Sequence, residues 1–180
     1  MRTSKKEQLL LAAFDIIEKD GLQALTYESL AAATDISKSG LIYHFPSRNH
    51  LIADLNRYAA NNWVERLKAE AGGDLGEITI YDRLRALIKV HAEMSSRADL
   101  ILTVDAMENP DLAAIWNEEF CKWLISEEYA GEDIFLIQLV SDGLWLHDYI
   151  SGGGLSGEQR EKAVKNACEL VDLLEARSRH

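Results

Sequence analysis

The stretch from Thr26 to Phe45 constrains the fold more than any other, because it predicts two short helices joined by a tight turn. Thr26 is a good N-cap residue, since its hydroxyl can accept a hydrogen bond from the first helical turn. Asp35 favours a turn, because its side chain can bond nearby backbone groups. Ser37 can cap a second helix, which Pro46 ends by excluding the preceding residue from the helical region. This arrangement predicts a helix-turn-helix, whose second helix fits the major groove of DNA.

The second of these helices has side chains that suit DNA. Lys38 and Ser39 stand at its N-terminal end, where side chains reach base edges. Gly40 would let the backbone come close to the duplex, and Tyr43 can direct its hydroxyl to a phosphate oxygen. The helix that follows Pro46 would point its exposed N–H groups at a phosphate. The stretch therefore predicts a DNA-reading surface.

The segment ISKSGLIYHFPSRNHLI, residues 36–52, resembles the recognition-helix signature of the TetR family of bacterial transcriptional regulators. The distinctive combination is one glycine after Lys38, an aromatic pair near the helix end, and Pro-Ser-Arg before the next helix. Residues 26–52 follow the family pattern throughout. The resemblance implies DNA contacts at nine positions: Thr26, Lys38, Ser39, Gly40, Leu41, Tyr43, His44, Ser47 and Arg48.

Helical periodicity runs through nearly the whole chain, which has only two prolines and no alternating strand pattern. We therefore predict an all-α fold of about nine helices. A first helix over residues 4–20 and the two-helix motif at 26–45 would form a three-helix headpiece, residues 1–46. A long helix from Ser47 to Ala71 would lead into a larger helical bundle, residues 47–180, for ligand binding and dimerisation.

Charge is distributed unevenly along the chain, whose net charge is −11. Residues 1–50 carry six basic and six acidic side chains, so the whole acid excess lies in residues 51–180. Electrostatic attraction to DNA is local, because salt screens it beyond about 10 Å at 0.1 M. A neutral headpiece can therefore still bind DNA, with modest and salt-sensitive non-specific affinity.

Large side chains at helical spacing in the second half of the chain are candidates for a ligand pocket. Each of them could equally be ordinary core. The TetR resemblance implies a small-molecule pocket among these helices, and the aromatic content suggests a hydrophobic ligand. The candidate residues are His91, Met94, Met107, Trp116, Phe120, Trp123, Trp145, His147 and Tyr149.

The last two helices carry nearly continuous apolar faces, which could pack on their own core or on a second copy of the chain. The resemblance implies the second arrangement, a four-helix dimer interface. A two-fold homodimer would require a palindromic operator. The expected interface residues are Ile137, Val140, Ser141, Leu144, Ala163, Ala167, Leu170, Val171 and Leu174.

The sequence offers no pattern typical of an enzyme, a cofactor site or a metal site. It contains no nucleophile elbow, HExxH or CxxC. His91 with Glu93, and His147 with Asp148, lack the same-face spacing that a metal site on one helix requires. Without a signal peptide or a membrane-length apolar run, we expect a cytoplasmic protein that does not enter a membrane.

The expected function is that of a TetR-like regulator, a repressor released from operator DNA by a small-molecule effector. A second interpretation remains open, because the headpiece has few basic residues. In that interpretation the chain is a helical protein that binds a ligand or a partner, and its headpiece binds DNA weakly or not at all.

Overall fold

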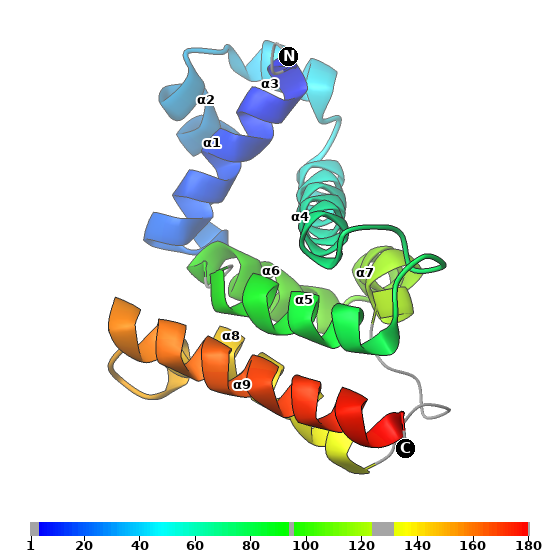
Figure 1. Ribbon diagram of the computed structural model, residues 1–180. Helices are drawn as coiled ribbons and strands as arrows, with labels where there is room; N and C mark the ends of the chain where they lie inside the picture. The colour runs from blue at the N-terminus through cyan, green and yellow to red at the C-terminus, as the bar shows by residue number, and fades with distance from the viewer. Residues whose placement is uncertain (1–3, 94–95, 124–131, 180) are drawn as a thin grey trace. The chain divides into compact units, whose positions relative to one another are not determined.

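The computed structural model describes residues 4–93, 96–123 and 132–179, and within these residues it contains helices and no strand (Figure 1). The predicted all-α fold is therefore confirmed. The elements are α1 (Lys5–Asp20), a 3-10 turn (Leu22–Ala24), α2 (Tyr27–Thr34), α3 (Lys38–His44), α4 (Arg48–Ala71), α5 (Ile80–Glu93), α6 (Arg97–Met107), α7 (Pro110–Trp123), α8 (Glu132–Ile150) and α9 (Gly157–Ser178).

Packing divides the chain into two compact units. The first contains Met1–Asn61 and Ser96–Glu118, and the second contains Asn62–Ser95 and Glu119–His180. Helices α4 and α7 each contribute residues to both units. The expected boundary after residue 46, between a DNA-binding and a ligand-binding domain, stays a prediction. The packing places α6 and most of α7 in the same unit as the headpiece helices.

Local capping explains where the headpiece helices begin. The Ser4 hydroxyl accepts a hydrogen bond from the Glu7 N–H, and the Glu7 carboxylate accepts one from the Ser4 N–H. Thr26 and Ser29 form the same reciprocal pair at α2. Between α2 and α3 the chain turns at Asp35, whose φ of 52° lies in the left-handed region that Asp tolerates better than most residues.

The core of the first unit lies among α1, α2, α3 and the start of α4. Leu30 of α2 and Leu41 of α3 are fully buried against residues of α1 such as Ile17. Helix α6 joins the same core through Leu102. It is also tied to the end of α1, because the Arg97 guanidinium donates to two backbone carbonyls there at 3.0 Å.

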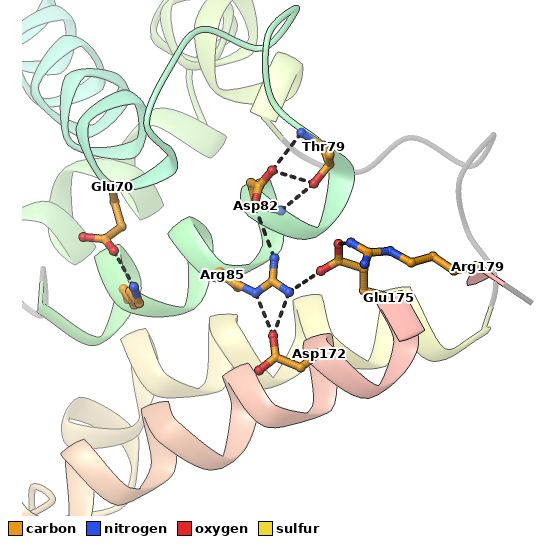
Figure 2. A network of polar contacts seen from close by, with 8 residues as sticks. Glu70, Thr79, Asp82, Arg85, Asp172, Glu175 and Arg179 are labelled. Carbon is orange, nitrogen blue, oxygen red and sulfur yellow. Dashed lines mark hydrogen bonds and ion pairs between the residues drawn. The ribbon is translucent and has the colours of Figure 1, made fainter. Parts of the chain in front are cut away.

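In the second unit α5, α8 and α9 pack together around a core that includes Ile88, Ile137 and Val171. Figure 2 shows the ion pairs that join α5 to α9 at one edge of this core. The Arg85 guanidinium on α5 lies 2.7 Å from the Asp172 carboxylate and also pairs with Glu175, both on α9.

None of the described helices combines the length and apolar character needed to cross a membrane.

Candidate nucleic-acid interface

One side of α3 is held by the core and the other is open. Leu41 is fully buried, whereas the Tyr43 side chain is 85% exposed and Ile42 is 45% exposed. Lys38 and Ser39 are exposed at the start of the helix. The Ser37 hydroxyl accepts a hydrogen bond from the Gly40 N–H at 3.2 Å, which caps this start as predicted. The open face is therefore presented on a short helix fixed from behind.

Tyr27 fixes the other end of α3. Its hydroxyl, on α2, donates to the carbonyl oxygen of Phe45, the residue that follows α3. Partial burial raises the pKa of this hydroxyl, so it remains a donor at neutral pH. No sequence pattern indicated this bond between the two helices.

Two of the expected DNA contacts, Leu41 and Gly40, also have packing roles in the structure. The Leu41 side chain has no exposed surface, so it supports α3 from inside. Gly40 has a packing reason for lacking a side chain, because a Cβ there would lie 2.9 Å from Cγ2 of Ile36. The glycine lets the turn before α3 pack against the helix.

Arg48 has a bracing role that the sequence did not indicate. Its Nε donates to the Leu25 carbonyl at 3.2 Å and its Nη2 donates to the Leu22 carbonyl at 3.1 Å. These bonds hold the start of α4 to the connection between α1 and α2. Beside it, the Ser47 hydroxyl lies 2.8 Å from Nδ1 of His50 and accepts from the His50 N–H.

Lys38 forms an ion pair with Glu28. Its Nζ lies 2.5 Å from Oε1 of Glu28, in the first turn of α2. Both side chains remain largely exposed, at 59% for Lys38 and 69% for Glu28. The hydrogen bond from the Lys38 ammonium lowers the pKa of the Glu28 carboxyl. The ten-residue separation spans the turn, so helical spacing could not have revealed the pair.

The expected ligand residues are divided between the two compact units. Met107 and Trp116 belong to the first unit, where Met107 is 76% exposed and the Trp116 Nε1–H donates to Oδ1 of buried Asn56 at 2.8 Å. Trp123 is buried in a core of the second unit. His147 and Tyr149 are half-buried on α8. Met94 and the side chain of Phe120 lie outside the described residues.

The structure does bring His91 and Trp145 together. The His91 imidazole stacks on Trp145, with ring centroids 5.9 Å apart, and lies 5.8 Å from the ring of Trp63. Its Nδ1 is 2.9 Å from the Ser141 hydroxyl and 3.6 Å from an oxygen of Asp142. Burial lowers the pKa of His91 to about 4, so the ring is neutral at pH 7. No sequence pattern indicated that Trp63 or Asp142 lies beside His91.

Two open clefts lie elsewhere. One of about 460 Å³ lies between the start of α4 and the α6–α7 junction, within the first unit. The other, of about 680 Å³, lies along α5 and α9. None of the seven expected ligand residues whose side chains the structure describes lines either of these two clefts. The ligand set therefore stays a prediction.

Both ends of this architecture match known protein families. Residues 6–55 match the family model described as bacterial regulatory proteins of the tetR family, and residues 82–172 match the tetracyclin repressor-like C-terminal domain. The second match alone covers half of the chain. The chain belongs to the TetR family.

Relatives of this TetR-family chain agree with that assignment. The HTH-type transcriptional regulator RutR of Escherichia coli strain K12 is 31% identical over 97 residues, which are 53% of this chain and 46% of RutR. The aligned part is thus about half the length of the curated relative that it matches.

Two solved structures share the fold over nearly their full length. A transcriptional regulator from Rhodococcus sp. Rha1 has a TM-score of 0.66 at 22% identity, covering 93% of this chain and 96% of its own. A regulator from Saccharomonospora viridis in complex with choline has a TM-score of 0.69 at 16% identity, covering 95% and 97%. At these identities the likeness shows the fold alone.

The structure shows where the expected dimer-interface residues of this TetR-family chain lie within one subunit. The most continuous apolar stripes of α8 and α9 face each other and α5. Five of the expected residues are buried in that subunit, namely Ile137, Ser141, Leu144, Ala167 and Val171, whereas Val140, Ala163 and Leu174 are partly exposed and Leu170 is exposed. The expected interface stays a prediction.

A different apolar face of α8 and α9 is open to solvent. On α8, Phe135, Leu136 and Leu139 are each more than half exposed. On α9, Leu170 is 45% exposed and Leu173 is 56% exposed. Spacings of three and four residues place these side chains along one stripe of each helix.

Proposed function

We propose that this TetR-family protein is a DNA-binding transcriptional regulator whose α3 enters the major groove. The observation that carries the proposal is the two-sided character of α3. Leu41 fixes the helix from within, while Tyr43 and the N-terminal Lys38 stand in solvent. A helix of this kind can enter the groove without rearranging its own core.

Each exposed side chain on this surface has a role that suits its chemistry. Lys38 would donate to guanine O6 and N7, and Ser39 can donate to or accept from either base of a pair. Ile42, which was not expected at the interface, would contact a thymine methyl group. The hydroxyls of Tyr43 and Ser47 would donate to phosphates and so fix the position of α3.

We further propose that two copies of the chain pair through the exposed stripes of α8 and α9. Five large apolar side chains, each about half exposed, would be covered by the same face of a second subunit. Two-fold pairing would present two α3 helices to half-sites about 34 Å apart, one turn of duplex. The operator would then be palindromic.

An effector would release the operator. The C-terminal region matches the tetracyclin repressor-like C-terminal domain, and the structural neighbour from Saccharomonospora viridis was solved with choline. In this chain the partly exposed Trp145, His147 and Tyr149 of α8 are the candidate contacts for a small organic molecule in the second unit. An effector that moves α4 would change the spacing of the two α3 helices and so weaken operator binding. The protein would act as a repressor in the cytoplasm.

The test is binding of the purified protein to the DNA upstream of its own coding region, at two salt concentrations. We expect saturable binding to a palindromic segment, weakening steeply with salt. Lys38→Ala should weaken binding about five- to hundredfold, as loss of a base contact does. Lys162→Ala, which removes an exposed cation on α9, is the matched control and should leave binding unchanged.

The alternative function predicts a different result. A protein whose helical body binds a ligand or partner would bind operator and random DNA alike, and Lys38→Ala would change neither. That outcome would contradict the proposed regulator.

A further inference from the structure

The Lys38–Glu28 ion pair lies on the surface that we propose for DNA. Lys38 is the first residue of α3, and Glu28 reaches it from α2 at 2.5 Å. Neither side chain is buried, so the pair contributes little to holding α2 and α3 together. The packing of Leu30 and Leu41 and the Tyr27–Phe45 hydrogen bond already join the two helices.

The pair has a larger effect on charge. Lys38 is the one Lys or Arg among residues 26–45, and the first 50 residues have no net charge. With Glu28 beside it, the start of α3 presents a neutral pair. The DNA phosphates therefore meet a bound cation and a carboxylate that repels them.

We propose that Glu28 limits DNA affinity by competing with DNA for Lys38; this inference rests on the proposed DNA-binding function. On random DNA the attraction is almost entirely electrostatic, so Lys38 gains little by leaving Glu28 and its phosphate contact is lost. On the operator, Lys38 leaves Glu28 because the acceptors on a guanine edge replace the lost ion pair with directed hydrogen bonds. Glu28 thus weakens binding to both, and the operator bears the full cost of breaking the ion pair.

The experiment compares Glu28→Gln with the wild-type full-length protein on operator and on random duplex, over a series of salt concentrations. In Glu28→Gln, Lys38 is free to bind a phosphate and release about one more counterion. The plot of log affinity against log salt on random DNA should therefore steepen by about one. Affinity for random DNA should rise about five- to tenfold near 0.1 M salt, and affinity for the operator should rise by at least as much.

Two further variants separate this role from simple charge. Asp15→Asn makes the same change in net charge on α1. Asp15 is exposed and forms no ion pair with any residue that the structure describes. This variant should not steepen the salt dependence of binding to random DNA. In a Lys38→Ala background, Glu28→Gln should also leave the slope unchanged, because the competing cation is gone.

Other results would overturn the inference. An unchanged slope and unchanged affinity for random DNA would show that Glu28 does not compete with phosphate. A loss of operator affinity confined to one base pair would show that Glu28 itself reads a base, as an acceptor from cytosine N4 would. If the wild-type protein fails to distinguish operator from random DNA, the proposed function fails as well, whereas a failure confined to Glu28→Gln leaves that function intact.

Discussion

His91 should make the protein markedly less stable in mild acid. The ring is 4% exposed, stacks on Trp145 and lies beside Trp63, and burial holds its pKa near 4. In the unfolded chain the same imidazole titrates near 6.5. Because the unfolded chain takes up the proton first, stability is full above pH 6.5 and falls as the pH drops towards 4.

The size of the effect follows from the two pKa values. The imidazole has a pKa near 6.5 in the unfolded chain and near 4 in the folded protein. This difference lowers the free energy of unfolding by about 2 kcal/mol at pH 5 and by about 3 kcal/mol below pH 4. Asp142, 3.6 Å away, would stabilise the imidazolium, so these figures are upper bounds. Burial raises the pKa of the Asp142 carboxyl, so the folded protein takes up this proton more readily than the unfolded chain. Protonation of Asp142 in acid therefore stabilises the folded protein and opposes the effect of His91.

The assay is urea denaturation of wild type and His91→Gln, followed by helical circular dichroism at pH 7 and pH 5. Glutamine keeps a polar group near Ser141 but does not titrate, and both proteins keep Asp142 and the surface carboxylates. We expect the stability advantage of wild type over His91→Gln to shrink by up to about 2 kcal/mol between the two pH values. An advantage that stays constant would refute a buried, neutral His91.

Three further changes test the headpiece and the subunit surface. Gly40→Ala places a methyl group 2.9 Å from Cγ2 of Ile36. The overpacking should cost about 1–3 kcal/mol, which exceeds the gain in helix propensity of about 1 kcal/mol. Urea denaturation measures this loss of stability, and an Ile36→Ala background should remove it. Tyr27→Phe deletes the hydrogen bond to the Phe45 carbonyl and should cost about 1 kcal/mol in the same assay, and no loss would show that the bond does not fix α3. Leu139→Glu puts a charge on the open face of α8 and should shift the protein to monomer in sedimentation, whereas Lys5→Glu on α1 should not; an intact Leu139→Glu dimer would place the interface elsewhere.

The sequence predicted local structure well, because the interactions that begin and end helices span only a few residues. The Ser37 cap forms as predicted, and the long helix ends at Ala71 as predicted. The all-α fold and the helix-turn-helix follow from the same kind of signal. They depend on residue type and spacing within a single helix or turn.

The face on which a helix packs was harder to predict. Both α8 and α9 have apolar residues around much of their circumference, and periodicity does not say which stripe meets the subunit's own core. Ile137 and Val171 pack inward, while Leu139 and Leu173 remain exposed. Only the positions of α5, α8 and α9 in three dimensions distinguish the two stripes.

Contacts between elements were also beyond the sequence. Lys38 meets Glu28, and Arg48 meets the Leu25 carbonyl, because the turns bring distant residues together. The expected ligand residues stay a prediction for a related reason. An aromatic residue such as Trp123 fills a core as readily as it lines a pocket, and its type does not distinguish the two.

The central claim, that α3 reads a palindromic operator, is tested most directly by selecting binding sites from a library of random duplexes with the full-length protein. We expect one enriched motif with two inverted half-sites about one helical turn apart, and we expect the Lys38→Ala protein to lose preference at one position in each half-site. Failure to enrich any motif at low salt, where wild type still binds the library, would contradict sequence-specific recognition by α3.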